Sequence, residues 1–131
     1  AVGLFAGAYF GAKISLAIGD APLVKPLIDL PKMAEKALSM LKRCMKAFID
    51  RDIEAAKRIC NEDDEVDALY DQIYKDLIFL MIDNQKLIKD ATYLIWAAHN
   101  LERIADRVTN IAERVVYMVT GKMEEMNVSK Y

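Results

Sequence analysis

The chain has 131 residues, the length of one domain, of which 54% are hydrophobic and 29% are charged. This composition excludes a disordered chain, a collagen and a low-complexity linker. The 18 basic and 20 acidic residues leave a net charge of −2, so there is no basic excess to neutralise a nucleic-acid backbone, and DNA and RNA are not expected partners.

Residues 1–19 are predicted to form an apolar helical segment that packs on the rest of the chain. The run from Ala1 to Ala12 is uncharged and ends at Lys13, whereas a membrane-spanning helix needs roughly 20 apolar residues. No positive charge precedes the run, so it does not have the pattern of a signal peptide. If exposed, this run would be an apolar patch that seeks a partner, so a homodimer is also considered.

All three prolines lie between Pro22 and Pro31. Because a proline pushes the preceding residue out of helical geometry, residues 20–30 are predicted to be an extended, proline-rich connector. A first helix is expected from about Pro31 to about Ile49, where apolar residues recur at three-to-four spacing.

Two more amphipathic helices are predicted after a turn at residues 50–52, where Asp52 offers an N-cap. The second helix covers about 52–82, and four polar residues in a row at 61–64 suggest a kink or break within it. The third runs over about 85–119 and stops at Gly121, a residue typical of left-handed C-terminal caps.

Short connections between long amphipathic helices favour antiparallel neighbours. Residues 31–121 are therefore predicted to form an all-α antiparallel three-helix bundle, with segment 1–19 as an additional helical partner and residues 122–131 as a polar tail. We assign no catalytic residue, because the chain has no glycine-rich phosphate loop and no Ser/His/Asp set.

Acidic residues recur at four-residue spacing along the edges of two apolar stripes. Asp63, Asp67 and Asp71 stack on one face of the second predicted helix. On the third, Glu102 and Asp106 lie one turn apart, with side chains about 6 Å from each other. Two like charges at that distance repel by about 3 kcal/mol at an effective dielectric constant of 20. A bound multivalent cation would reverse the sign of this interaction.

Carboxylate ligands suit hard cations such as Mg²⁺, Mn²⁺, Ca²⁺ and iron. The only histidine, His99, lies close to Glu102 on the helical wheel and could reach a metal, although a packed or solvent-facing histidine is more common. The candidate metal ligands are Asp67, Asp71, Glu102 and Asp106, with Asp63 and Asn110 as further candidates.

Two alternatives to a metal site stay open. In one, the bundle is a structural or interaction module without metal, whose acids only face solvent; Asp71 then pairs with Lys75, and Asp106 with Arg103. In the other, the protein is a carboxylate-bridged redox enzyme. Such enzymes carry Glu-x-x-His on two helices, and this chain contains no Glu-x-x-His, which disfavours that class.

Three arginines, Arg103, Arg107 and Arg114, fall on the outward side of the third predicted helix. Planar guanidinium groups pair well with carboxylates, so these side chains are candidates for docking an acidic partner surface. The alternative is that they only solvate the outer face of the helix.

The run NLERIADRVTNIAERVVYMVTG at residues 100–121 resembles the last helix of the PhoU family, the accessory regulators of phosphate-specific transport. The stretches DDEVDALYDQIY (63–74) and PLVKPLIDLPKMAE (22–35) agree with the same family. Family members resemble a tandem pair of three-helix units. The resemblance, over about residues 13–125, implies a fragment that holds the second unit and a piece of the first unit's last helix. Residues 4–12 contain no acid, so a metal site of the first unit is either absent or cannot be assigned in this chain.

PhoU proteins carry paired E(D)-x-x-x-D motifs that hold clusters of metal ions, and Asp67 to Asp71 and Glu102 to Asp106 match these motifs. The resemblance therefore implies iron, manganese or magnesium on these carboxylates. It also implies a cytoplasmic, non-enzymatic negative regulator of the phosphate-starvation response. Its implied partners are the ATPase subunit of the phosphate importer and the phosphate sensor kinase, through which it would be peripheral to the membrane.

Overall fold

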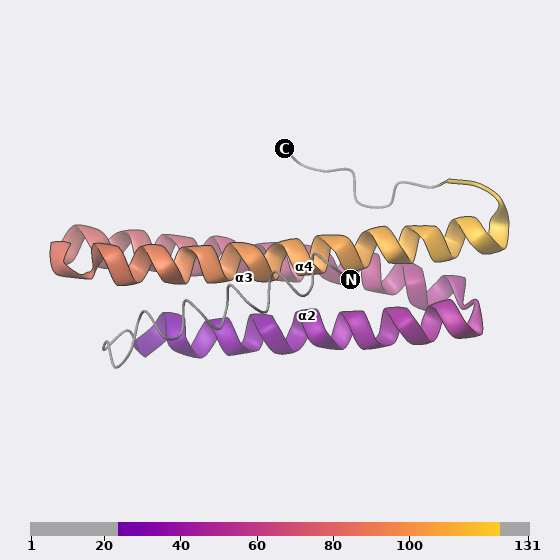
Figure 1. The fold of residues 1–131 in the computed structure, drawn as a ribbon, viewed down its shortest axis with the longest axis horizontal. Coiled ribbons are helices and arrows are strands. Elements are labelled where there is room, and N and C mark those ends of the chain that lie inside the picture. Colours follow the sequence, from indigo (N-terminus) through magenta and orange to yellow (C-terminus); the bar gives the residue numbers. More distant parts are fainter. Residues whose placement is uncertain (1–23, 124–131) are drawn as a thin grey trace.

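A computed structural model describes residues 24–123 of the chain. These residues form three long helices that lie side by side, and the second in chain order runs antiparallel to the first and third (Figure 1). No strand occurs within residues 24–123, so the predicted all-α antiparallel three-helix bundle is confirmed. Segment 1–19 and residues 124–131 of the predicted tail lie outside the described residues. The elements are α2 (Val24–Asp50), α3 (Ile53–Asp83), the 3₁₀ turn η1 (Gln85–Leu87) and α4 (Ile88–Thr120).

The first helix begins earlier than predicted, because α2 starts at Val24, inside the connector expected at residues 20–30. Pro26 falls in the first turn, where a backbone N–H has no intrahelical acceptor and its loss costs no hydrogen bond. Pro31 lies inside the helix and removes one internal hydrogen bond. Burial of Leu30 in the core offsets this loss, since its side chain is only 9% exposed.

The polar run at residues 61–64 does not break α3, which is continuous there. Its side chains are accommodated by the neighbouring helices. Arg43 Nη1 of α2 donates to Glu62 Oε1 at 2.6 Å, while Asp63 turns inward and is 2% exposed. The helix therefore continues through this run, because Glu62 pairs with α2, Asp63 is buried in the bundle, and the other two side chains face solvent.

Both predicted helix caps are confirmed. The Asp52 side chain accepts a hydrogen bond from the N–H of Ala55 at 3.1 Å and so caps the start of α3. Gly121 closes α4 in the left-handed region, with φ of 71°, and its N–H donates to the carbonyl of Tyr117 at 2.8 Å. A left-handed backbone carries no steric penalty at glycine, which is why the helix ends at this residue.

Small side chains along α4 let the helices approach closely. Ala91, Ala98, Ala105 and Ala112 recur at seven-residue spacing, and all four are fully buried. Such a repeat keeps one narrow stripe facing the partner helices along the whole length of α4. The acidic residues that flank this stripe are thereby brought close to those of α3.

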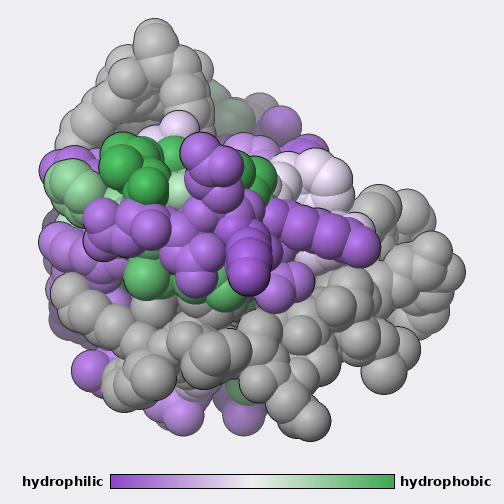
Figure 2. All heavy atoms as spheres, turned by 90° about the vertical axis from the view of Figure 1, so that its left-hand side faces the viewer, coloured by the Kyte–Doolittle hydropathy of each residue, from purple (hydrophilic) through white to green (hydrophobic). Residues whose placement is uncertain are grey.

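The end of the bundle where α3 turns into α4 has a mixed surface. Figure 2 views this end, where hydrophobic and hydrophilic side chains both reach the surface. Phe79, Ile82 and Ile88 are exposed near this turn. Within residues 24–123, none of the helices combines the length and the apolar character that crossing a bilayer requires.

Candidate metal centre

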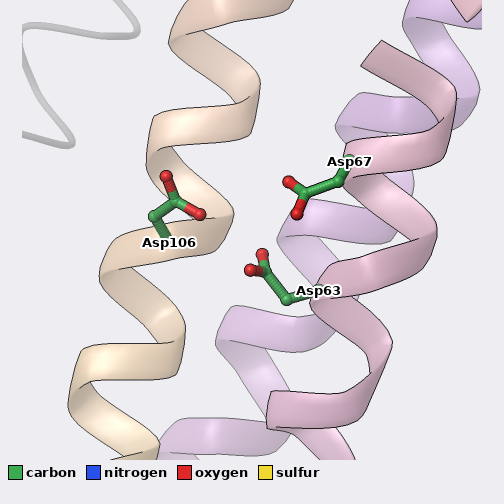
Figure 3. Close-up of side chains that lie close together, drawn as sticks. All are labelled: Asp63, Asp67 and Asp106. Carbon is green, nitrogen blue, oxygen red and sulfur yellow. The ribbon is translucent and has the colours of Figure 1, made fainter. Parts of the chain in front are cut away.

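Three aspartates from two helices meet beside the seam between α3 and α4. Asp63 and Asp67 of α3 and Asp106 of α4 each offer a carboxylate oxygen, and these atoms all lie within 4.8 Å of one another. Figure 3 shows the three carboxyl groups turned toward one another across the space between the two helices. The antiparallel pairing of α3 and α4 thus brings together the two acidic stripes recognised in the sequence.

Helical periodicity explains why these side chains point into the seam. On α3, Ile59, Asp63 and Val66 follow at four- and three-residue spacing, so Asp63 occupies a position of the apolar stripe itself. Ile59 and Val66 are 1% and 0% exposed. On α4, Asp106 directly follows the fully buried Ala105 and is partly buried at the edge of the core.

The spacing of the three carboxylate oxygens suits a single hard cation. Two ligand oxygens on one ion can be at most twice the metal–oxygen distance apart, which is about 4.2 Å for Mg²⁺ and about 4.8 Å for Ca²⁺. The oxygens of Asp63, Asp67 and Asp106 lie within 4.8 Å of one another, which is the limit for Ca²⁺, and a smaller ion would draw the carboxylates closer together. The donor set contains only carboxylates, the ligand type that hard cations prefer. The residues present therefore fit such an ion.

The cluster carries a concentrated negative charge. Burial, the charges of Asp67 and Asp106, and a hydrogen bond with Asp106 together raise the pKa of Asp63 to about 7. The pKa of Glu102 is also raised, first by burial and then by the charges of Asp106 and Asp67. Both shifts mean that ionising these carboxyl groups costs free energy, which a nearby cation would offset.

Glu102 lies at the edge of this cluster, between it and His99. The Glu102 side chain is 12% exposed, and its Oε2 lies 3.4 Å from Nδ1 of His99. His99 lowers the pKa of Glu102, in opposition to the larger effect of burial. The Tyr70 ring lies beside the imidazole, with centroids 6.1 Å apart. His99 thus contacts the candidate site through Glu102 and from its solvent side.

The structure separates the predicted ligands of α3. Four residues advance a helix by about 400°, so each step from Asp63 to Asp67 to Asp71 turns the side chain about 40° further round. Asp63 is buried, Asp67 is partly buried and Asp71 is exposed. Asp63, a secondary candidate in the sequence, therefore joins the cluster, while Asp71 does not. The signal for this was the position of Asp63 within the apolar stripe.

On α4, Asp106 joins the cluster, Glu102 borders it, and Asn110 is exposed and outside it. Asn110 is one turn beyond Asp106, and the same winding of about 40° per four residues carries it toward solvent. The cluster therefore consists of Asp63, Asp67 and Asp106, and Glu102 borders it.

Comparison with known proteins places this helical bundle in a family. The model of the PhoU domain matches residues 30–115, which include the whole of α3 and most of α2 and α4. This chain belongs to the PhoU family. The matched region contains the three clustered aspartates, and the family predicted from the sequence motifs is confirmed.

Curated PhoU homologs share about a third or more of their aligned residues with this chain. The phosphate-specific transport system accessory protein PhoU homolog 2 of Thermotoga maritima is 40% identical over 111 residues, covering 85% of this chain and 47% of that protein. The PhoU homolog of Clostridium acetobutylicum is 35% identical over 99 residues, covering 76% and 45%. The PhoU homolog of Deinococcus radiodurans is 36% identical over 107 residues, covering 82% and 50%. The chain spans about half the length of these relatives.

The three arginines of this PhoU domain lie where the helical wheel predicted. Arg103, Arg107 and Arg114 are all exposed on α4. Trp96, which is 54% exposed, falls on the same outward side of the helix. This side of α4 is therefore free of the core and presents guanidinium groups to solvent.

Proposed function

We propose that this chain is a metal-binding regulatory domain of phosphate uptake that works by contact and not by catalysis. Its relatives are named accessory proteins of phosphate-specific transport. The observation that supports the metal part is the cluster of Asp63, Asp67 and Asp106, in which carboxylates from two helices meet in a partly buried place.

Asp63, Asp67 and Asp106 would hold the first cation, and Glu102 is close enough to contribute to the same negative field. Iron, Mn²⁺ and Mg²⁺ are the proposed ions, because all three accept oxygen ligands. Such an ion supplies positive charge that removes the repulsion between α3 and α4. Asp71 and Asn110 are exposed and are not required for this first ion.

The proposed partners are the ATPase subunit of a phosphate importer and the sensor kinase of the phosphate two-component system. Through them the protein would act as a negative regulator of the phosphate-starvation response, in the cytoplasm and peripheral to the membrane. Membership of the PhoU family supports this proposal. Homodimer formation belongs to the same proposal and would be tested by sedimentation of the full chain.

Loss of one carboxylate should remove most of the metal affinity. In calorimetric titrations with Mn²⁺, Mg²⁺ and Fe²⁺, Asp106→Asn is expected to weaken binding of the preferred ion about a hundredfold, because it replaces the charged carboxylate that α4 contributes with a neutral amide, whose oxygen is a weaker ligand. The wild type should also melt at a higher temperature as free metal rises above its dissociation constant. Wild-type melting that does not change at millimolar metal would contradict the metal part of the proposal.

Asp64→Asn is the matched control for this experiment. Asp64 directly follows Asp63 but is exposed, so this variant removes the same charge from the same region without touching the cluster. We expect its affinity to fall less than about threefold, the effect of a diffuse field alone. Glu62 is a poorer control, because it is paired with Arg43 of α2. Equal losses from Asp106→Asn and Asp64→Asn would mean that the acids do not coordinate the ion.

A second candidate is a bundle that needs no metal. The raised pKa of Asp63, about 7, favours it, because a proton on this carboxyl can relieve the repulsion in place of a cation. The melting series with added metal distinguishes the two candidates. Only the metal-binding protein gains thermal stability from Mn²⁺ or Fe²⁺ at a fixed pH.

The exposed arginines of α4 should guide association with the importer ATPase. Arg103→Glu combined with Arg107→Glu is expected to slow association about tenfold at low salt and less at high salt, because surface charge acts mainly on the encounter. The control pair Arg58→Glu and Lys75→Glu makes the same charge change at exposed positions of α3. Association that stays unchanged at both salt concentrations would exclude the arginines from the interface.

A further inference from the structure

His99 and Glu102 form a mixed nitrogen and oxygen pair at the edge of the carboxylate cluster. Both lie on α4, and Nδ1 of His99 is 3.4 Å from Oε2 of Glu102. This separation is longer than the roughly 2.7–3.2 Å of a typical N–H···O hydrogen bond. It matches two ligand atoms on one ion, because bonds of about 2.1 Å that meet at a tetrahedral angle place their donor atoms about 3.4 Å apart.

Tyr70 of α3 lies beside this pair and limits how far the imidazole can turn. The rings of Tyr70 and His99 are inclined at 54° to each other, and Tyr70 is partly buried. Burial and then the charge of Glu102 raise the pKa of Tyr70, so the phenol also lies within range of that carboxylate. The His99 side chain is 53% exposed. An ion can therefore approach the pair from solvent, while the aromatic ring borders it on the α3 side.

Asp106 links the pair to the three clustered aspartates. It lies one turn beyond Glu102 on α4, and after burial its charge is the next cause that raises the pKa of Glu102. A carboxylate has two oxygens, so Asp106 can direct one toward the aspartate cluster and the other toward a neighbouring ion. In proteins that hold two ions in one site, the metals are about 3.5–4 Å apart. A second ion on Glu102 and His99 would thus share one carboxylate with the first.

We propose that His99 supplies a nitrogen ligand which, together with Glu102, makes a second cation position that is selective for transition-metal ions. Imidazole is a favoured ligand of Zn²⁺, Fe²⁺ and Ni²⁺, whereas Mg²⁺ and Ca²⁺ are held by oxygen ligands. The three aspartates offer oxygen alone and accept either class of ion. The position at His99 therefore discriminates between the two classes.

This inference rests on the proposed metal binding of the cluster, because Asp106 belongs to both positions. It adds the class of ion that the site selects and the residue that makes the selection. The alternative is a surface ion pair between His99 and Glu102 that holds no metal. The ion pair and the metal position differ in what Nδ1 of His99 contacts when ions are added, so the imidazole itself is the reporter.

The test uses nuclear magnetic resonance of the full chain, whose single histidine gives one set of imidazole signals. The ¹⁵N-labelled protein is titrated with Zn²⁺ in one series and with Mg²⁺ in another, at one fixed pH. Zn²⁺ on Nδ1 leaves the ring proton on Nε2, so we expect a strong shift of the Nδ1 signal and a single tautomer. Mg²⁺ should leave the tautomer unchanged. Calorimetry should also find one more Zn²⁺ than Mg²⁺ bound per chain.

Three variants separate ligation from charge. His99→Gln should weaken Zn²⁺ binding at the second position about thirtyfold and change Mg²⁺ affinity less than about threefold, because it removes the nitrogen ligand alone. Glu102→Gln should also weaken Zn²⁺ binding at this position. Glu54→Gln is its matched control, since the same change is made at an exposed residue in the first turn of α3, and it should weaken Zn²⁺ binding less than about threefold.

Zn²⁺ that binds without shifting the His99 signals would overturn this inference and leave the aspartate cluster as the metal site. Equal weakening of Zn²⁺ and Mg²⁺ binding by His99→Gln would also overturn it, because the histidine would then act only through its contact with Glu102. If the wild type bound neither ion, the inference would fail together with the metal part of the proposed function. Zn²⁺ bound at His99 without any binding of Mg²⁺ would support the inference and exclude only a hard cation on the aspartates.

Discussion

Asp63→Asn is expected to stabilise the metal-free protein by about 4 kcal/mol at pH 8. Asp63 is 2% exposed, and burial together with the charges of Asp67 and Asp106 raises its pKa from 3.8 to about 7. Keeping this carboxylate ionised at pH 8 therefore costs free energy that an amide of the same shape does not. Urea unfolding of both proteins in a chelating buffer measures the difference.

The pH dependence has a definite sign. The folded state holds the Asp63 proton more tightly than the unfolded state, so the group has no cost below pH 4 or so, where both states are protonated. Its cost grows as pH rises from about 4 to about 7 and is constant above that range. The gap in stability between Asp63→Asn and the wild type should widen across the same window. If the unfolding free energies of Asp63→Asn and the wild type changed in parallel between pH 4 and pH 7 or so, this would contradict the raised pKa of Asp63.

Asp71→Asn is the control for this prediction. Asp71 lies two turns along the same acidic stripe but is exposed, and a surface substitution of this kind usually changes stability by less than about 0.5 kcal/mol. With saturating Mn²⁺ the order should reverse for Asp63→Asn, because the wild type gains metal-dependent stability that the variant lacks. The same two variants therefore separate the cost of the buried charge from its use as a ligand.

Met40→Ala should destabilise the bundle by about 2–5 kcal/mol, whereas Met45→Ala should cost less than about 1 kcal/mol. Both residues lie on α2, and the chemical change is identical. The Met40 side chain is 0% exposed and that of Met45 is 48% exposed. Only the first deletion removes contacts from all sides and leaves a cavity in the core. Urea unfolding of the two variants under one set of conditions measures the difference.

Similar losses from Met40→Ala and Met45→Ala would mean that α2 packs with a different rotation, which would place Met45 inside. Conversely, a loss confined to Met40→Ala supports the packing of α2 with Met40 inside the core and Met45 at the surface.

Local signals in the sequence determined the helices and their ends. Apolar residues at three-to-four spacing predicted three helices, because one face of a helix must be buried against its neighbours. Asp52 and Gly121 marked a start and an end, since each satisfies backbone groups within a few residues of itself. The motifs at residues 63–74 and 100–121 also identified the family, which the match over residues 30–115 confirms.

The start of α2 and the continuity of α3 depended on contacts that are distant in sequence. Prolines between Pro22 and Pro31 locally favour an extended chain, yet α2 begins at Val24, and Leu30 within it is buried in the core. The polar residues at 61–64 locally suggested a break, but Arg43 of another helix pairs with the side chain of Glu62. No local pattern contains these partners, so local reasoning placed the start of α2 too late and suggested a break that α3 does not have.

The choice of acids that meet was also a tertiary result. Spacing alone made Asp67 and Asp71 equivalent, because both lie four residues from a neighbouring acid. In the bundle, the winding of about 40° for every four residues turns Asp63 into the core and Asp71 out to solvent. The register of α3 against α4 then sets Asp106 opposite Asp63 and Asp67. Sequence spacing could place each acidic stripe on its helix, but only the packing of the two helices decides which carboxylates share one place.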